Sequence, residues 1–472
     1  MQVKSYITER MDLPQRICLP ADTEVNSDLI KTLIEIKNKE NDRFLTLQGY
    51  YKGNAKIRER KKESHKSNNK MVLDYASYIV DILQGMAVGR PVTYAVQDED
   101  RENFKIVQDI LDSNREQDEN TALAKMSGIN GLAYEIVYVD EEKNCRFNEL
   151  QPQNMILVYD DKINPEPWLG LYVRDDISLD NLLADDKKQA VTAYTADKII
   201  EFESTQDGYK VKDDGEYENV LNIFPVIEWA NNDEYIGDFE RVISLIDALN
   251  LVYSDNVNNF EEQVNALLIL WGMVNTDSED VKNLKEDGIL LATGQAGGKQ
   301  DAKFITRDIN DDSVQNLINN LDVAIHKFSK APNVSDEKFS GVASGESQKY
   351  KVFATDQVIE LKQRKYHTAL TKRMKLICKY LNLRHGKDLD YRNVTINFQD
   401  NKPYDELNNA QTVKQLLDAG VSRQYAMSKL KGIDDIGEEL ERQRQEKEEA
   451  YQDYANSFMN DEKEDEDLED EE

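Results

Sequence analysis

The chain has 472 residues, of which 39% are hydrophobic and 32% charged, and its formal net charge is −32. This length suffices for about three domains with buried cores, and so acidic a surface disfavours tight, non-specific binding of nucleic acid. No stretch reaches the ~20 apolar residues that a membrane helix needs, and the N-terminus lacks the pattern of a secretory signal. The three cysteines (Cys18, Cys145, Cys378) are far apart and odd in number, which favours reduced thiols in a cytosolic protein.

The N-terminal half contains both helical and strand-like patterns. Residues 1–28 contain two prolines and little periodicity, so we expect an arm there. Apolar residues at helical spacing predict helices from Leu29 to Phe44, over 71–88 and within 101–127. The period then changes to two, which predicts a hairpin at 131–150 and strands near 155–159, 168–173, 190–194, 199–202 and 220–227, in addition to one at 92–94. We therefore predict an α+β domain with a largely antiparallel sheet.

A dense basic run follows the first predicted helix, over residues 52–70. The simpler interpretation is a solvated loop that neutralises acidic neighbours. The alternative is a contact for an acidic partner or nucleic acid, and its candidate residues are Lys52, Lys56, Arg58, Arg60, Lys61 and Lys62.

Two helices bracketing a small tip are predicted in the second half of the chain. Apolar residues at three- and four-residue spacing predict helices over 238–263 and 311–331, and residues 265–309 between them form a compact mixed segment. Ala331-Pro332 ends the second helix, because proline lacks an amide proton. A loop containing Gly341 and Gly345 follows, and residues 348–384 then contain neither proline nor glycine, which predicts a helix of roughly 55 Å. Three further helices are expected within 404–457, before an acidic tail at 461–472 that we expect to be disordered.

The predicted long helix has an unusual balance of charge. Between Lys349 and Lys387 there are eleven lysines and arginines against two acidic residues. Its predicted apolar face consists of Ala354, Val358, Leu361, Leu370, Met374, Ile377 and Leu381. We favour packing of the basic face against an acidic neighbour, in the same chain or in the next subunit, over direct contact with phosphates.

No constellation of catalytic residues is evident. The four histidines are not at zinc-binding spacing to one another or to a cysteine, and no nucleophile elbow or kinase motif occurs. The segment ATGQAGGKQD fails as a P-loop, because Thr293 stands where the first glycine should be and Gln300 replaces the Ser/Thr that holds magnesium. We expect no enzyme activity, no cofactor and no metal site.

Several motifs, taken together with the order of elements, carry a resemblance to a known family. They are QGYYKGNAKI at 48–57, YIVDILQGMAVGRPVTY at 78–94, FPVIEWANNDEYIGDFERVISLIDALN at 224–250 and VSDEKFSGVASGESQKYK at 334–351, followed by the long helix. Between about residues 29 and 385 the chain resembles the portal proteins of tailed bacteriophages, of the siphophage type from Gram-positive hosts.

The resemblance implies the portal fold and a domain organisation. That fold has an α+β wing, a two-helix stem, a small α/β clip, a long spine helix and a helical crown. The implied parts are an N-terminal arm (1–28), the wing (29–236), stem helices (237–263 and 310–333), the clip (264–309), a tunnel loop (334–346), the spine helix of the wing (347–403), the crown (404–460) and the acidic tail (461–472).

The resemblance also implies a function and its partners. The subunits, usually twelve, form a ring at one capsid vertex, through which double-stranded DNA is packaged and ejected. The implied partners are the terminase large subunit, which supplies the ATPase, a head-completion or adaptor protein, and the major capsid and scaffolding proteins. The implied location is the virion, and the host cytoplasm during assembly, with no membrane contact.

The implied site residues fall into two groups. Those expected along the channel and tunnel loop are Lys327, Lys330, Ser335, Lys338, Phe339, Ser340, Gly341, Ser344 and Gly345. Those expected on the clip, facing the motor or adaptor, are Asp277, Glu279, Asp280, Lys282 and Lys285. Sparse lysines near the loop suit a channel in which DNA must slide, because many phosphate contacts would bind it tightly. The alternative function is a non-enzymatic cytosolic scaffold or adaptor, built of helices, that binds basic partners.

Overall fold

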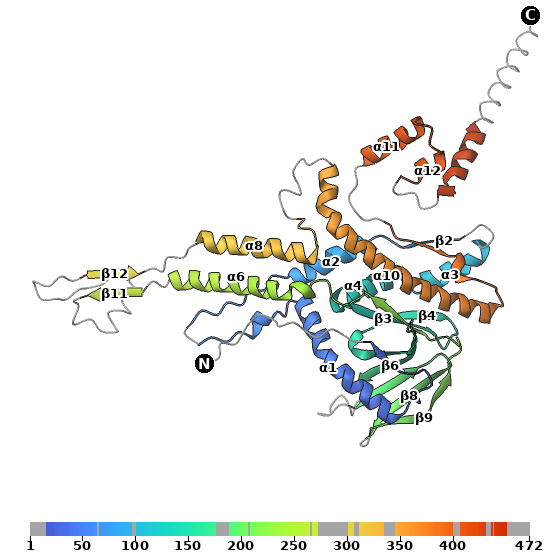
Figure 1. Ribbon diagram of the computed structural model, residues 1–472, viewed down its shortest axis with the longest axis horizontal. Coiled ribbons are helices and arrows are strands. Elements are labelled where there is room, and N and C mark those ends of the chain that lie inside the picture. Colours follow the sequence, from blue (N-terminus) through green and yellow to red (C-terminus); the bar gives the residue numbers. More distant parts are fainter. Residues whose placement is uncertain are drawn as a thin grey trace, which may run out of the picture. The chain divides into compact units, whose positions relative to one another are not determined.

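The fold is mixed α/β and divides into two compact units that are interleaved along the chain. The computed structural model describes residues 16–63, 66–96, 101–175, 188–205, 208–264, 267–271, 301–305, 311–334, 345–399, 406–430, 436–437 and 439–450 (Figure 1). The first unit takes its residues from 1–83, 123–136 and 149–335, and the second from 84–122, 137–148 and 336–472. Helix α2 (Tyr75–Val88), helix α4 (Glu116–Asn130) and strands β3 (Leu132–Val139) and β4 (Cys145–Leu150) each run from one unit into the other.

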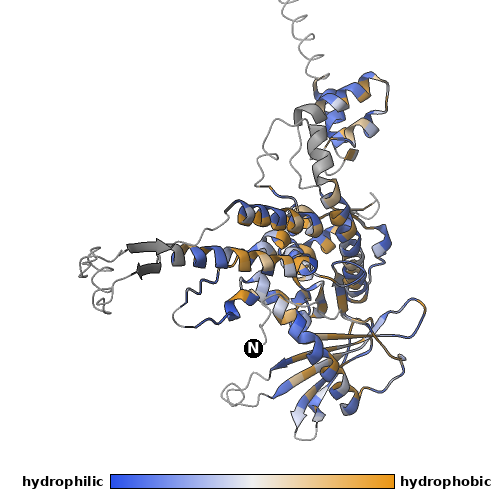
Figure 2. Cartoon of the chain, turned by 60° about the vertical axis from the view of Figure 1, so that its left-hand side comes forward, coloured by the Kyte–Doolittle hydropathy of each residue, from blue (hydrophilic) through white to orange (hydrophobic). Residues whose placement is uncertain are grey.

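The first unit contains a six-stranded sheet against which helix α1 (Ser27–Tyr51) packs. The strand order is β1-β5-β6-β7-β8-β9, in which only the β1–β5 pair is parallel. The strands are β1 (Ile17–Cys18), β5 (Met155–Tyr159), β6 (Pro167–Asp175), β7 (Gln189–Tyr194), β8 (Lys198–Thr205) and β9 (Gly208–Glu218). Hydrophilic and hydrophobic residues both occur along these strands, as expected for a sheet with a covered face and a solvated one (Figure 2).

Strand β5 is buried on both faces, which explains why all five of its residues are apolar or aromatic. Ile156 and Val158 pack in one core with Ile30 and Leu33 of α1. The alternate residues Met155, Leu157 and Tyr159 pack in a second core with Phe44 and with strands β3 and β10 (Val226–Ala230). Side chains alternate between the two faces of a strand, so β5 joins the two cores.

A second sheet has the order β10-β3-β4, in which β10 pairs antiparallel with β3. The fully buried Trp229 donates a hydrogen bond from Nε1 to Oε2 of the buried Glu135, at 2.8 Å. The turn between α4 and β3 requires Gly131, whose φ is +86°, because a Cβ there would lie 1.9 Å from the carbonyl oxygen of Tyr235.

The second unit is built around helix α10 (Gly345–His385), which has 41 residues. It also contains α3 (Arg101–Ser113), the antiparallel pair β2 (Thr93–Ala95) and β13 (Thr395–Asn397), α11 (Glu406–Asp418) and α12 (Arg423–Met427). Short 3-10 helices occur at Lys56–Glu59 (η1), Pro152–Asn154 (η3), Glu240–Val242 (η4) and Tyr391–Asn393 (η5).

Helix α10 buries a polar network as well as an apolar face. Arg373 is fully buried, and its Nη1 donates to Oδ1 of Asn120 at 2.7 Å and lies 3.4 Å from Oε1 of Glu116. Its guanidinium also lies 4.4 Å from the centre of the Phe147 ring. The hydroxyl of Tyr94 donates to the carboxylate of Glu116, and burial raises the pKa of Tyr94 well above its ordinary value. One cation of the basic helix is therefore paired with an acidic residue of the same chain, as the favoured interpretation expected.

The structure confirms the mixed α/β class and the largely antiparallel sheet, and it corrects several elements. The predicted strand at 220–227 is instead β10 at Val226–Ala230, and β9 was not predicted. The pattern within 101–127 belongs to two helices, α3 and α4. Leu361, which was assigned to the apolar face of the long helix, is 51% exposed, and Ile359 is buried in its place. The assignment of wing, stem, clip, spine and crown stays a prediction.

Candidate functional site

Two helices of the first unit, α6 (Ile243–Val264) and α8 (Asp311–Ser329), lie side by side (Figure 1). The chain between them contains the antiparallel hairpin of β11 (Leu267–Trp271) and β12 (Asp301–Ile305). The helices bury Ile246 and Leu249 of α6 and Ile318 and Ile325 of α8. Among the described residues of the pair, four large apolar side chains are exposed: Phe260 (67%), Leu317 (47%), Val323 (63%) and Phe328 (58%). Part of the apolar surface of this helix pair is therefore not covered by other described residues of the same chain.

The start of α6 is fixed to α1 by a buried ion pair. Arg43 of α1 donates from Nε to Oε1 of Glu240 at 2.8 Å and from Nη2 to Oε2 at 2.6 Å. Both side chains are almost fully buried, and Arg43 also donates to the carbonyl oxygen of Tyr235. Glu240 in turn accepts a hydrogen bond from the amide of Gly237 at 2.9 Å. The motif YIGDFE at 235–240 therefore sets the position at which α6 begins.

A polar stripe on α6 holds residues of the segment before α2, and we call the described parts of this segment, 60–63 and 66–73, the strap. Asn250, Ser254 and Asn258 accept hydrogen bonds from the backbone amides of Leu73, Met71 and Asn69, at 2.8, 2.9 and 2.8 Å. One turn before Asn250, Asp247 accepts from the hydroxyl of Tyr50 at 2.7 Å. The stripe was not predicted, although its spacing of three, four and four residues, which places it on one helix face, is visible in the sequence.

In the basic run at 52–70 only Arg60 is buried among the cations, and several of the others contact groups of the first unit. Arg60 is 2% exposed, and its Nη1 lies 2.7 Å from Oδ1 of Asp255, which Lys62 also approaches to 3.5 Å. Arg58 donates from Nε to the carbonyl oxygen of Gly53 at 2.7 Å. These contacts support the interpretation of this run as neutralising acidic neighbours. Among the other candidates, Lys52 follows the end of α1, Lys56 lies in η1, and Lys61 is exposed.

The end of α8 is clamped onto α2 by a cluster of aromatic and polar side chains, which we call the root clamp (Tyr75, Tyr78, Asp322 and His326). The hydroxyl of Tyr78 donates to the carbonyl oxygen of Pro332 at 2.8 Å and accepts from the amide of Val334 at 3.1 Å. The hydroxyl of Tyr75 donates to Oδ1 of Asp322. Burial and this carboxylate together raise the pKa of Tyr75.

His326 lies at the centre of the root clamp. Its ring forms T-shaped contacts with the Tyr75 and Tyr78 rings, with centroid distances of 5.8 and 5.6 Å. Nδ1 lies 3.1 Å from the carbonyl oxygen of Ala331, and Nε2 lies 3.5 Å from Oδ1 of Asp322. A carbonyl oxygen can only accept, so Nδ1 carries the proton in this contact. The clamp therefore fixes residues 331–334, where the predicted tunnel loop begins.

The structure places only part of the predicted channel and clip residues. Lys327 is in the last turn of α8, and the exposed Lys330 follows that helix with a positive φ of 61°. Gly345 is the first residue of α10. Ser335, Lys338, Phe339, Ser340, Gly341 and Ser344 of the loop, and Asp277, Glu279, Asp280, Lys282 and Lys285 of the clip, lie outside the described residues.

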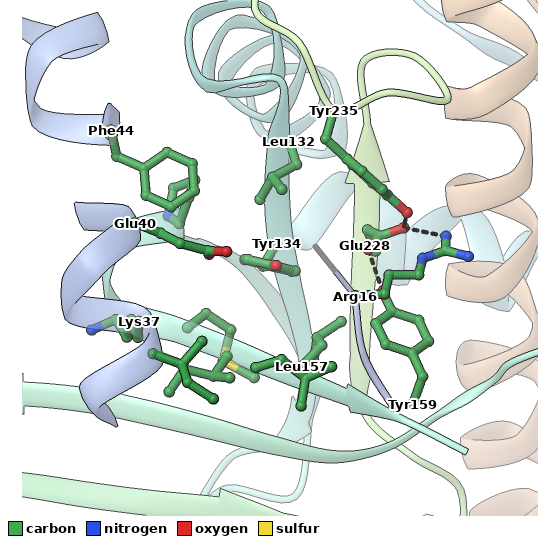
Figure 3. A pocket seen from close by; sticks show the side chains of 15 residues that line it. Arg16, Lys37, Glu40, Phe44, Leu132, Tyr134, Leu157, Tyr159, Glu228 and Tyr235 are labelled. Atoms are coloured by element: carbon green, nitrogen blue, oxygen red, sulfur yellow. Dashed lines mark hydrogen bonds and ion pairs between the residues drawn. The ribbon is translucent and has the colours of Figure 1, made fainter. Parts of the chain in front are cut away.

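A small cavity of about 50 Å³ lies between α1 and the strands β3, β5 and β10 (Figure 3). On one side, Oε2 of Glu228 accepts from the hydroxyl of Tyr159 and Oε1 accepts from Tyr235 at 3.0 Å, while Arg16 approaches Oε1 to 3.4 Å. On the α1 side lies Lys37, whose burial lowers its pKa to about 8. The cavity is far smaller than the roughly 300–1,000 Å³ of small-molecule sites, so we regard this cluster as structural.

Membrane-spanning helices and metal-binding clusters are both absent from the described residues. No helix among them has the length and apolarity required to cross a membrane. No group of three or more His, Cys, Asp or Glu side chains in the same part of the chain is placed to hold a metal ion.

The chain is similar to known proteins over most of its length. The family model "Phage portal protein, SPP1 Gp6-like" matches residues 30–453. The portal protein of Bacillus phage SPP1 is 22% identical over 423 residues, which cover 86% of this chain and 81% of that protein.

Two solved structures have lower similarity to the chain. One is from the virion of a native gene transfer agent particle, with a TM-score of 0.45, 12% identity and coverage of 80% of this chain and 89% of that chain. The other is from the neck of an empty gene transfer agent particle, with a TM-score of 0.43, 11% identity and coverage of 74% and 87%. The family model alone spans well over half of the sequence, and on that ground the chain belongs to the phage portal protein family.

Proposed function

We propose that this chain forms a closed ring, of about twelve subunits, at one vertex of a phage capsid, and that double-stranded DNA is packaged and ejected through its channel. The observation that carries the proposal is the match of the portal family model to residues 30–453. A ring needs interfaces that join different surfaces of the same chain and close by rotation. The exposed apolar side chains of α6 and α8 are suited to such an interface, because large exposed apolar surface marks sites of association.

The proposed parts follow the order of elements. The paired helices α6 and α8 serve as the stem, and the segment 264–309 that joins them serves as the clip. Residues 29–236 and the long helix α10 form the wing, 334–346 the tunnel loop, and 404–460 the crown. The pairing of α6 with α8 and the hairpin β11–β12 between them support the first two assignments.

The proposed partners are the terminase large subunit, a head-completion protein, and the major capsid and scaffolding proteins. The clip residues Asp277, Glu279 and Asp280 are candidates for the motor contact. Substituting all three by alanine is expected to leave rings intact and to weaken binding of the purified terminase. Unchanged terminase binding would remove this contact from the proposal.

The ring itself is tested by native mass spectrometry and negative-stain images of the purified protein. We expect a closed ring with a central hole. A monomer or dimer at every protein concentration and salt concentration, including in the presence of the scaffolding protein, would contradict the proposal.

A further inference from the structure

The exposed face of α10 is cationic, although the chain as a whole is strongly acidic. Between Leu361 and Lys387 the sequence contains nine lysines and arginines and no aspartate or glutamate. Two of these cations, Lys362 (2% exposed) and Arg373 (fully buried), belong to the interior. The remaining cations therefore require an explanation of their own.

Four of them form what we call the α10 stripe: Arg364, Lys372, Lys375 and Lys379. Their spacing of eight, three and four residues places them on one face of the helix, opposite to buried residues such as Leu370 and Ile377. The side chain of Arg364 is 72% exposed, and its Nη2 lies 3.8 Å from Oε2 of Glu360. Lys372 and Lys375 are exposed, and Lys379 is half-exposed. In the part of the chain that the structure describes, no ion pair involves the three lysines.

Two features distinguish the α10 stripe from an ordinary solvated helix face. Lys375 has like-charged neighbours at i−3 and at i+4, and such pairs destabilise an isolated helix. The same arc also carries Phe353 and Leu361, which are 61% and 51% exposed. A long helix that combines unneutralised cations with exposed large apolar side chains is better suited to an interface than to bulk water.

We infer that the α10 stripe docks onto an acidic surface of a neighbouring copy of this chain. A protein with a net charge of −32 supplies the complementary partner itself, and contact between two different surfaces is what ring closure requires. The inference rests on the proposed ring, for which it names one of the two contacting surfaces.

The test replaces the three stripe lysines together, as Lys372→Glu, Lys375→Glu and Lys379→Glu. A control with the same change in charge replaces three exposed lysines elsewhere, as Lys39→Glu, Lys105→Glu and Lys414→Glu. Native mass spectrometry over a series of protein concentrations measures ring assembly. The stripe variant is expected to need about tenfold more protein for half-assembly, since three exposed pairs are lost, whereas the control assembles like the unmodified chain. Assembly of the unmodified chain is also expected to weaken with salt.

Further measurements separate the alternatives. If the stripe variant forms rings at the same protein concentrations as the unmodified chain, the inference about the stripe is wrong, but the proposed ring is not contradicted. If those rings had also lost binding to a short DNA duplex, the stripe would be a nucleic-acid contact instead. If the stripe variant has a lower thermal midpoint than the control variant, its loss of ring assembly results from misfolding, and this outcome counts against docking. Absence of rings from the unmodified protein would contradict the proposed function itself.

Discussion

At the scale of single residues, the root clamp depends on hydrogen bonds that a conservative substitution removes. Tyr78→Phe deletes the hydroxyl that bridges Pro332 and Val334 and keeps the ring that packs against His326. We expect the amide of Val334 to exchange with deuterium faster, and the free energy of unfolding to fall by about 1 kcal/mol. Hydrogen exchange followed by mass spectrometry measures the first effect.

The matched control is Tyr217→Phe, which alters an exposed tyrosine of β9. Equal exchange of residues 331–334 in both variants would show that the hydroxyl of Tyr78 does not hold this segment.

Lys37 is a buried lysine whose charge opposes folding. Its pKa is about 8 in the folded chain against 10.5 for the unfolded one, because burial disfavours the charged form. Between these values the unfolded state binds more protons, so the contribution of Lys37 to stability increases as the pH rises through this window. Lys37→Met should therefore raise the free energy of unfolding at pH 7, by about 1–3 kcal/mol, and the gain should be smaller at pH 9.

Denaturant titrations that follow tryptophan fluorescence, to which the buried Trp229 contributes, measure this difference. A gain that is the same at both pH values would show that packing, and not charge, is responsible.

At the scale of elements, the strap is held by side chains of a single helix. Asn258 is 2% exposed, and its Oδ1 accepts from both the amide and the side chain of Asn69. Asn258→Ala leaves these donors unpaired, which should cost about 1–3 kcal/mol and loosen the strap. Limited trypsin digestion should then cut faster after Lys61, Lys62 and Lys66. Asn259→Ala, at the adjacent half-exposed position, is the control and should digest like the unmodified chain.

The helices with strong apolar periodicity were predicted well from the sequence. Helix α8 begins at the predicted residue and ends two residues before the predicted end, and α10 begins three residues early and ends one residue late. Such agreement is expected because the 3.6-residue period of a buried stripe persists over many turns.

The elements that sequence patterns missed lack a burial signal. Most residues of β9 are exposed, and its alternation of apolar and polar residues is limited to 209–212. β1 has two residues, and β13 pairs with a strand some 300 residues away, at Thr93–Ala95. The strap was missed because its basic residues resemble a solvated loop, and only the fold reveals that Arg60 is buried beside Asp255.

At the scale of the whole molecule, the role of the proposed tunnel loop can be tested while the residues that flank it on both sides are kept. Replacing residues 336–343 with a short Gly-Ser linker keeps Val334 on the root clamp and leaves α10 to begin at Gly345. We expect rings to form normally, because the clamp and the helices remain, and DNA packaging or retention to fail. Packaging at the unmodified level in infected cells would contradict the role of this loop. A linker of the same composition inserted at 206–207, between β8 and β9, controls for a general effect of the change.

The interleaving of the two units has a consequence for synthesis on the ribosome. Arg373 is 257 residues away from Glu116 along the chain, so the polar network of the second unit stays incomplete until most of the protein has been translated. Until then, Glu116 lacks its contact with Arg373, and Phe147 lacks the guanidinium that lies over its ring. Contacts so distant in sequence slow folding, and unfinished chains expose surfaces that aggregate. Nascent chains that stop before α10 should therefore depend on host chaperones, so phage yield is expected to be sensitive to chaperone supply.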